Sequence, residues 1–144
     1  MQIDQVDRAL LDLLRVNARA PVAELARKLG LARTTVQARI DRLEANGVIL
    51  GYTLRTGDPL QPMLRATVLV AVEPRSAAQV LARLRSLQGI ERVHTTSGRF
   101  DLLIQVEAQT TTELDDMLDR IGEVSGVRSS ESLIHLATKL DRST

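Results

Sequence analysis

The side chains with the most evident chemistry lie in one short stretch, residues 33–42. Polar residues there alternate with aliphatic ones at helical spacing, so a helix would place the polar ones on one face. A glutamine can form a paired hydrogen bond with adenine, and an arginine can bind guanine or a phosphate. We therefore predict a face that contacts double-stranded DNA. It consists of Arg33, Thr34, Thr35, Gln37, Ala38, Arg39 and Arg42.

The same face also has a simpler interpretation. Arg39 or Arg42 can form an ion pair with Asp41, Glu44 or another nearby acid, which would leave a solvated helix surface without a ligand. If DNA is the ligand, four further basic residues are weaker candidates for phosphate contacts. They are Arg8, Arg15, Arg27 and Lys28.

Two short helices and a tight turn over Val22–Ile49 would hold this face in place. Ala26 is small enough for a close helix crossing, and Gly30 can end the first helix with a positive φ. Val36 lies where a side chain would fill the angle between the helices. These positions predict a helix-turn-helix whose second helix, from about Ala32 to Ala45, enters a DNA major groove.

A further helix and a strand complete the predicted head. Apolar residues at helical spacing predict a helix over Asp4–Val16, with Asp4 as its cap. Pro21 suits the first turn of the helix that follows. After a helix stop at Asn46–Gly47, the segment Val48–Leu54 has the composition of a strand. The head is therefore expected to be a winged helix-turn-helix.

A linker separates this head from the rest of the chain. The stretch Thr56–Met63 contains Gly57, Pro59 and Pro62, which disfavour regular secondary structure. We place the helix-turn-helix domain at residues 1–53, the linker at 54–64 and a second domain at 65–144.

Charge is divided unevenly between the two halves. Residues 1–57 carry nine basic and six acidic side chains, a balance of +3, and residues 58–144 carry ten and twelve, a balance of −2. A basic head on an acidic body is typical of a protein in which only the head contacts DNA.

The second half contains an internal repeat. An apolar helix pattern precedes Gly89–Ile90, and a similar pattern precedes Gly126–Val127. Each helix is flanked by apolar strand patterns, and Ser97–Arg99 is the turn that joins the two repeats. The order βαββαβ predicts a ferredoxin-like domain, so the whole chain is expected to be of the α+β class. The four strands are expected over Arg65–Glu73, Ile90–Thr96, Phe100–Glu107 and Val127 to about Thr138.

The predicted sheet has apolar residues on both faces, but two helices can cover only one of them. Leu69 and Ala71 point away from their apolar neighbours in the first strand, and residues 133–137 are apolar on both faces. An uncovered apolar face would be a large exposed patch. We therefore predict a homodimer in which the sheet of a second copy packs on this face. Two heads in a dimer also suit a palindromic DNA site.

Composition argues against several other classes of function. Aromatic residues make up 1% of the chain, which disfavours single-stranded nucleic-acid binding by base stacking, and cysteine is absent. His94 and His135 lie on neighbouring predicted strands, and we interpret them as ordinary sheet residues rather than a pH sensor or metal site. We find no nucleophile–base arrangement and no phosphate-binding loop, and we expect no enzyme, no cofactor and no metal. The chain has no membrane-spanning run or signal peptide, so we expect a cytoplasmic protein.

Three segments in this order resemble the leucine-responsive/asparagine-responsive (Lrp/AsnC) family of transcription regulators. They are IDQVDRALLDLLRVNAR at the start, ELARKLGLARTTVQARIDRLEANGVILGY in the head, and the turn SGRFDLLIQV. The chain departs from many family members at the start of the recognition helix. Those members have a serine there, whereas this chain has Ala32. Thr34 or Thr35 is the candidate to replace its capping or phosphate contact.

The resemblance implies dimers that often associate further, commonly into octamers. It also implies an effector, usually an amino acid, bound between the C-terminal domains of neighbouring subunits, which resemble the family's RAM domain. Gly98 can expose amide groups to a carboxylate, and Asp101 can accept an ammonium group or orient the turn. The alternative is a plain hairpin turn with Phe100 as core filler. The candidate effector residues are Ser97, Gly98, Arg99, Phe100 and Asp101, together with Arg128, Ser129 and Ser130 in the second repeat.

Three functions stay open at this point. The first is a sequence-specific transcriptional regulator that responds to an amino acid or a related metabolite. The second is an effector-independent architectural DNA-binding protein, and the third is a metabolite sensor whose head has lost DNA binding. A DNA mobility shift with amino acids added distinguishes them.

Overall fold

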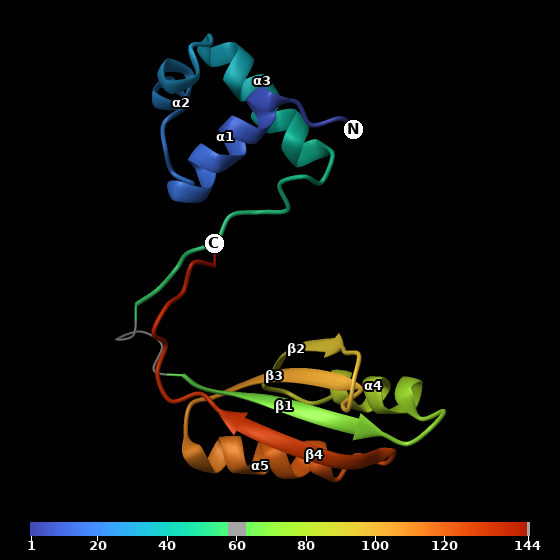
Figure 1. Ribbon diagram of the computed structural model, residues 1–144. Helices are drawn as coiled ribbons and strands as arrows, with labels where there is room; N and C mark the ends of the chain where they lie inside the picture. The colour runs from blue at the N-terminus through green and yellow to red at the C-terminus, as the bar shows by residue number, and fades with distance from the viewer. Residues whose placement is uncertain (58–62, 144) are drawn as a thin grey trace. The chain divides into compact units, whose positions relative to one another are not determined.

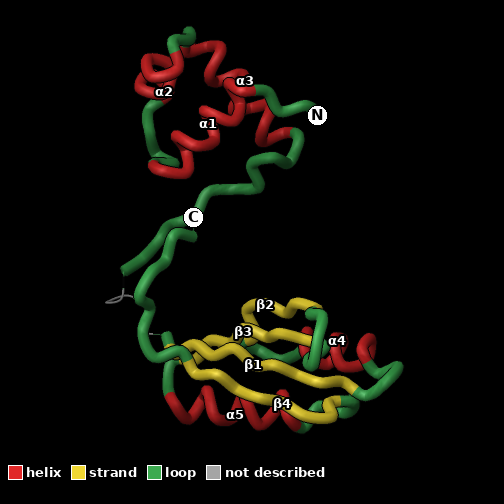
Figure 2. Tube along the Cα trace, in the orientation of Figure 1, coloured by secondary structure: helices red, strands yellow, loops and turns green. Residues whose placement is uncertain are grey.

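The computed structural model describes residues 1–57 and 63–143. The chain forms two compact units, one of residues 1–55 with 142–144 and the other of residues 56–141. Three helices make up the first unit, and a sheet with two helices makes up the second (Figures 1 and 2), which confirms the α+β class. The linker expected over residues 54–64 stays a prediction, because Pro59 and Pro62 lie outside the described residues.

The three helices of the head begin and end close to the predicted positions. Asp4 caps the first helix: its Oδ1 accepts a hydrogen bond from the Asp7 N–H at 2.7 Å, and Asp7 Oδ2 accepts one from the Asp4 N–H at 3.2 Å. This reciprocal capping box satisfies two N–H groups that a helix start leaves unpaired. Gly30 ends the second helix in the left-handed region, with φ of 67°. The helices are α1 Gln5–Val16, α2 Val22–Leu29 and α3 Arg33–Ala45.

A small aliphatic core joins these helices. Val36 and Leu43 of α3 are fully buried, and Ala26 of α2 is 4% exposed where the helices cross. The predicted roles of Ala26 and Val36 in a helix-turn-helix are therefore confirmed. The buried cluster of the head consists of Leu10, Leu14, Leu25, Ala26, Val36, Ile40 and Leu43.

The strand expected over Val48–Leu54 is not formed, so the wing predicted for the head is a wrong prediction for the described residues. Val48 and Ile49 instead donate their N–H groups to the carbonyl of Leu43, at 2.9 and 3.1 Å. Tyr52 donates its hydroxyl to Glu44 at 3.0 Å. A strand requires a hydrogen-bonded neighbour, and the described part of this unit offers none.

A four-stranded antiparallel sheet forms the second unit, and its order is β2-β3-β1-β4. The sequence of elements is βαββαβ, as the internal repeat predicted. The strands differ from their expected bounds by one to four residues: β1 lies one residue earlier, β2 ends one residue earlier, β3 begins two residues later and ends one later, and β4 ends about four residues earlier. The elements are β1 Leu64–Val72, α4 Ala77–Arg85, β2 Ile90–Thr95, β3 Leu102–Ala108, α5 Thr111–Gly122 and β4 Val127–Ile134.

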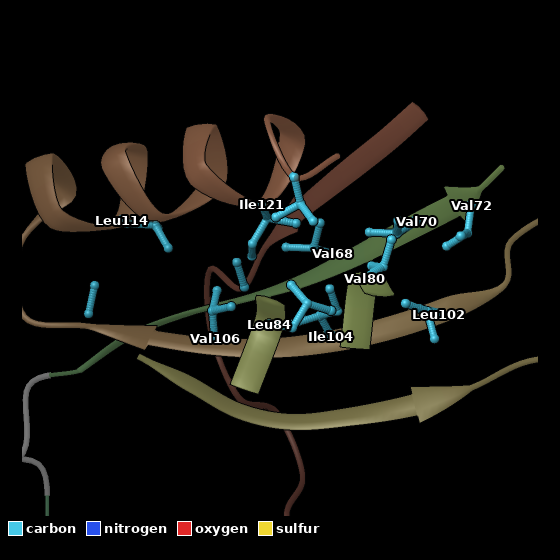
Figure 3. Packing of buried hydrophobic residues seen from close by; sticks show 13 residues of the cluster. Val68, Val70, Val72, Val80, Leu84, Leu102, Ile104, Val106, Leu114 and Ile121 are labelled. Atoms are coloured by element: carbon cyan, nitrogen blue, oxygen red, sulfur yellow. The ribbon is translucent and has the colours of Figure 1, made fainter. Parts of the chain in front are cut away.

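Both helices cover the same face of the sheet (Figure 3). Val68 and Val70 of β1 and Ile104 of β3 point toward this layer, where Leu84 of α4 and Ile121 of α5 meet them. All five side chains are at most 1% exposed. This aliphatic core fixes the sheet and therefore the turns at its ends.

The opposite face is apolar only along its centre. Leu69 of β1 is paired directly with Leu103 of β3. Thr67, Gln105 and Glu131 also lie on this face, so polar side chains border the apolar patch that the sequence predicted. The apolar stretch at residues 133–137 extends past the end of β4, which stops where its pairing partner β1 begins. Leu136, which lies beyond the strand, is 96% exposed.

The two histidines do not form a pair. His94 is on β2 and His135 follows β4, and these strands are the opposite edges of the sheet. His135 instead shares a hydrogen bond of 2.8 Å with the Thr67 hydroxyl. The expectation that they lie on neighbouring strands is wrong, because strand order in space differs from order along the chain. Among the described residues, no helix is both long and apolar enough to cross a membrane.

Candidate nucleic-acid interface and effector turn

Helix α3 turns one face into the head and leaves another face open. Val36, Ile40 and Leu43 are buried against the other helices. Six of the predicted DNA-contacting residues are exposed, and Arg39 is partly buried; the exposed ones are Arg33, Thr34, Thr35, Gln37, Ala38 and Arg42. Thr34, Thr35 and Ala38 line a shallow hollow along α3 together with Arg39 and Arg42. The structure therefore brings five of the seven predicted residues together along one hollow of α3, whereas Arg33 and Gln37 are exposed on the same helix but do not line it.

The start of α3 carries no side-chain cap. Ala32 occupies the cap position with an extended backbone, and no side chain accepts a hydrogen bond there. The idea that Thr34 or Thr35 replaces the missing serine as a cap is therefore wrong. The first N–H groups of α3 keep their hydrogen-bonding capacity, and such groups suit a phosphate.

Gln37 is held by a neighbour on its own helix. Its Nε2 donates a hydrogen bond to Asp41 Oδ1, one turn further along, at 2.8 Å. Both residues are exposed. A paired contact with adenine uses both the nitrogen and the oxygen of the amide, so DNA would have to displace Asp41 from the nitrogen.

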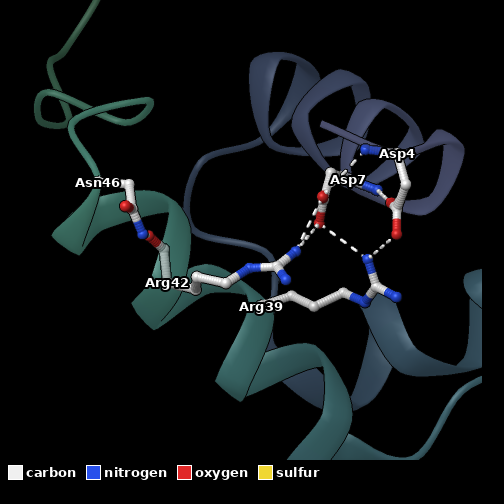
Figure 4. Close-up of polar contacts among 5 residues, drawn as sticks. All are labelled: Asp4, Asp7, Arg39, Arg42 and Asn46. Atoms are coloured by element: carbon white, nitrogen blue, oxygen red, sulfur yellow. Dashed lines mark hydrogen bonds and ion pairs between the residues drawn. The ribbon is translucent and has the colours of Figure 1, made fainter. Parts of the chain in front are cut away.

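Arg39 and Arg42 are engaged by aspartates of the first helix (Figure 4). Arg39 Nη1 donates to Asp4 Oδ2 at 2.7 Å and to Asp7 Oδ1 at 3.0 Å. Arg42 Nη2 donates to Asp7 Oδ2 at 2.9 Å and to its Oδ1 at 3.2 Å. We call these four residues, Asp4, Asp7, Arg39 and Arg42, the aspartate clamp. The expected ion pairing of the two arginines exists, and its partners are Asp4 and Asp7 rather than Asp41 or Glu44.

The aspartate clamp also shifts proton affinities. The hydrogen bond from Arg39, followed by the one from the Asp7 backbone, lowers the pKa of Asp4 from 3.8 to about 2. The same contacts with Asp4 and Asp7 raise the pKa of Arg39 above its ordinary value. Asp4 and Arg39 therefore stay charged at neutral pH, and the hydrogen bond between them is charge-assisted.

Two of the other basic candidates form exposed ion pairs within single helices. Arg15 lies 3.1 Å from Asp12, and Lys28 lies 3.2 Å from Glu24. Exposed pairs of this kind contribute little to stability, so these residues remain free to exchange their partner for a phosphate.

The candidate effector turn is closed by its own backbone. Thr96 donates its N–H to the Asp101 carbonyl at 2.9 Å and its hydroxyl to the Phe100 carbonyl at 2.8 Å. Gly98 has φ of 110°, a conformation that favours glycine. Asp101 Oδ2 accepts the Val72 N–H at 2.7 Å, so this carboxylate ties the turn to the end of β1.

The second-repeat candidates lie at the same end of the sheet as this turn. Ser129 and Ser130 of β4 are paired with the last residues of β1, the strand to which Asp101 is bonded. Arg99 Nη2 lies 3.7 Å from Glu131 Oε2, and its guanidinium lies 5.0 Å from the centre of the Phe100 ring. The structure thus brings the residues of the two repeats to one edge of the domain. Ser129, Ser130 and Arg128 are all exposed.

Sequence reasoning missed Asp7 as the partner of two arginines of the candidate interface. It is the one buried charged side chain among the described residues. The signal present in the sequence was the spacing of Asp4 and Asp7, which is that of a capping box, but this pattern says nothing about a partner on another helix. The link to Arg39 joins residues 32 positions apart and needs the folded structure.

Comparison with known proteins covers both units. The AsnC-type helix-turn-helix domain matches residues 3–44, and the Lrp/AsnC ligand binding domain matches residues 65–144. An uncharacterised HTH-type transcriptional regulator of Pyrococcus abyssi is 34% identical over 141 residues, which cover 94% of each chain.

Solved structures agree with these matches. The structure of E. coli AsnC has a TM-score of 0.89 and 25% identity, covering 100% of this chain and 99% of that chain. A feast or famine regulatory protein from M. tuberculosis, complexed with L-methionine, has a TM-score of 0.85 and 30% identity. This match covers 99% of this chain and 98% of that one.

Proposed function

Because this chain belongs to the Lrp/AsnC family of transcriptional regulators, we propose that it binds specific double-stranded DNA sites through α3 and responds to an amino acid. The observation that supports DNA binding most directly is the open face of α3. Its apolar residues are buried, whereas polar residues that suit base edges and phosphates lie outside that buried stripe and are mostly exposed. The chain is a regulator with a ligand-binding domain and not an enzyme, as its two family domains and named relatives show.

Contacts to DNA divide into positioning and readout. The unpaired N–H groups at the start of α3 and the side chain of Arg33 suit the phosphate backbone, which fixes register without reading sequence. Gln37 lies in the N-terminal half of α3, which contacts base edges in such motifs, and the arginines of the aspartate clamp follow it along the helix, where they suit guanine or phosphate.

Replacing Gln37 tests this assignment. We expect Gln37→Ala to weaken binding to a selected duplex by about 1–3 kcal/mol, the usual worth of a paired base contact, while binding to a scrambled duplex changes little. Gln79→Ala, an exposed glutamine on α4 of the other unit, is the matched control. Fluorescence anisotropy on both duplexes gives the two affinities. Equal losses on both duplexes would place Gln37 on the backbone instead.

The effector is proposed to bind at the turn Ser97–Asp101. The amide groups around Gly98 suit the carboxylate of an amino acid. Asp101 orients the turn, since its carboxylate is bonded to the Val72 N–H. Arg128, Ser129 and Ser130 at the same end of the sheet would complete the site with residues of a neighbouring subunit. The L-methionine complex of the M. tuberculosis protein supports an amino acid as the ligand.

Dimer formation is proposed through the open face of the sheet. Leu69 and Leu103 form its apolar centre, and the exposed Leu133 of β4 extends this centre toward one edge. Packing this face against its copy would bury the three leucines in a two-sheet sandwich. We expect a dimer, or an octamer built from dimers, by light scattering after gel filtration. A monomer at micromolar concentration would contradict this arrangement.

A mobility shift with the DNA upstream of the coding sequence, repeated with each amino acid, tests the whole proposal. We expect a shift at moderate salt that one or a few amino acids change. A shift that no amino acid alters would favour an architectural DNA-binding protein. No shift, with an amino acid still bound by calorimetry, would favour a sensor without DNA binding. We expect the protein to act in the cytoplasm, where its DNA lies.

A further inference from the structure

We infer that Asp7 is a positioning residue for DNA recognition, and that its buried carboxylate holds Arg39 and Arg42 in the orientation in which they meet DNA. This inference rests on the proposed function, because it concerns how the α3 face is prepared for its ligand. Asp7 itself would not touch DNA, since its side chain is fully buried.

The burial of Asp7 makes its partners obligatory. A carboxylate that leaves water needs compensating charge and hydrogen bonds. Here, Oδ1 accepts from Arg39 and Arg42, and Oδ2 accepts from Arg42 and from the Asp4 N–H. Both compensating charges come from α3, so the first helix fixes the two arginines as well as the helix that carries them (Figure 4).

The aspartate clamp leaves both arginines able to bind a ligand. Its bonds use Nη1 of Arg39 and Nη2 of Arg42, and a guanidinium has five N–H donors in total. The side chains of Arg39 and Arg42 remain 25% and 47% exposed. Both line the hollow on α3, beside Thr34, Thr35 and Ala38. The remaining donors are therefore accessible on the same side as the predicted DNA face.

Asp7 would act by orienting the two arginines and not by adding positive charge to the head. Two carboxylates face two guanidinium groups in the clamp, so it adds no net positive charge that would attract DNA without regard to sequence. Holding a flexible arginine in place before binding reduces the entropy that is lost when it is fixed on a base. The clamp should therefore favour selected sites over random DNA.

Asp7→Asn tests this inference, with Asp12→Asn as the matched control. Both changes add one positive charge to the head, and both release an arginine, because Asp12 pairs with Arg15 on the exposed side of α1. The duplexes are one enriched by in-vitro selection with the unmodified chain and one scrambled version of it. For Asp7→Asn we expect the ratio of the two affinities to fall about tenfold relative to Asp12→Asn, the size of one lost base contact.

The ratio of the two affinities distinguishes a positioning role of Asp7 from a merely structural one. Loss of folded head would reduce binding to both duplexes together, whereas loss of orientation lowers the ratio and leaves the scrambled duplex bound as in the control. Circular dichroism shows whether α1 to α3 persist. If Asp7→Asn unfolds the head, Asp4→Asn carries the test. It removes one of the two acceptors of Arg39, and asparagine still caps a helix. We expect a smaller fall in the ratio for Asp4→Asn, roughly threefold.

Two outcomes would overturn the inference while leaving DNA binding intact. One is an affinity ratio for Asp7→Asn and Asp4→Asn equal to that of Asp12→Asn. The other is tighter binding of Asp7→Asn to both duplexes than the control shows, which would mean that the clamp withholds the arginines. If the unmodified chain enriches no sequence at all, the proposed function fails first and the inference falls with it.

Discussion

The two units of this chain differ in what they bury. The head buries a charged side chain, Asp7, together with seven apolar residues. The sheet domain buries fourteen apolar residues, and no charged side chain is buried in its described part. Two of its charged residues, Arg65 and Glu107, lie on the open face of the sheet. The smaller unit has less apolar area to bury, and it adds a charged network that also fixes α3.

This difference suggests a division between stability and specificity. An apolar core tolerates changes of shape that keep its volume, whereas a buried ion pair penalises the loss of one partner. The sheet domain is therefore expected to be robust, and the head to depend on a few particular contacts. Three comparisons between the units test this view.

The largest expected effect comes from a matched pair of leucines. Leu25 of the head and Leu84 of the sheet domain are each 1% exposed. Truncation to alanine should lower the free energy of unfolding of its own unit by about 2–5 kcal/mol. Because the head has the smaller core, we expect Leu25→Ala to leave it largely unfolded and Leu84→Ala to leave the sheet domain folded but less stable.

Urea unfolding followed by circular dichroism measures both effects. Leu54→Ala, at a side chain that is 81% exposed, is the control and should change little. A single shared transition in both variants would contradict the separation of the units. If the head of Leu25→Ala and the sheet domain of Leu84→Ala kept the same free energy of unfolding, the head would not be the less stable unit.

A smaller difference is expected between two glycines with positive φ. Gly30 of the head has φ of 67° and no neighbour within 4 Å of an added Cβ, so Gly30→Ala should cost about 1 kcal/mol. Gly126 has φ of 102°, and an added Cβ would lie 2.8 Å from Ser76 Cβ and 2.9 Å from Val80 Cγ2. Strain and overpacking together should cost about 2–4 kcal/mol for Gly126→Ala.

For the two glycines, we expect the opposite order of sensitivity to substitution from the one expected for the two leucines. Here the sheet domain should be the more sensitive one, because its turn lies directly against α4 and the turn of the head is open. Thermal unfolding of each variant gives the shift. A larger loss for Gly30→Ala would show that the turn of the helix-turn-helix has contacts beyond the described ones.

The features that could be predicted from the sequence are those set by patterns of residues close together in the chain. Burial of Val36 and Leu43 follows from helical spacing, and the strands of the second unit follow from the repeated Gly–aliphatic pairs. These features depend on residues close together in the chain. The positive φ of Gly30 was predictable for the same reason, because glycine ends helices in this conformation.

The features that sequence reasoning missed depend on contacts between distant residues. The ion pairs of Asp7 join residues more than 30 positions apart, and only the crossing of α1 and α3 makes them. Val48–Leu54 has strand composition, but it has no strand partner in the described part of the head. His94 and His135 were misplaced because chain order does not give strand order.

The smallest expected effect is an opposite response of the two units to acid. The folded pKa of Asp4, about 2, lies below its ordinary value of 3.8 because Arg39 stabilises the carboxylate. Its contribution to the head is present above about pH 3.8 and is lost as the pH falls toward 2. Burial, followed by a hydrogen bond with Glu91, raises the pKa of Glu107 above its ordinary value of 4.5. Ionised Glu107 therefore destabilises the sheet domain at neutral pH, and this penalty disappears as the pH falls to 4.5.

Two variants isolate these contributions. Glu107→Gln should raise the melting temperature of the sheet domain slightly at neutral pH and leave it unchanged below pH 4.5. This gain is reduced because the variant also loses the contact between Glu107 and the half-exposed Arg65. That contact is long, at 4.0 Å, and therefore weak. Asp4→Asn should lower the melting temperature of the head at neutral pH, and this difference should vanish near pH 2. Melting curves at fixed protein concentration across this range measure both. If Glu107→Gln destabilises the sheet domain at pH 7, the contact with Arg65 outweighs burial of the carboxylate. The open face would then depend on a specific ion pair, as the head does.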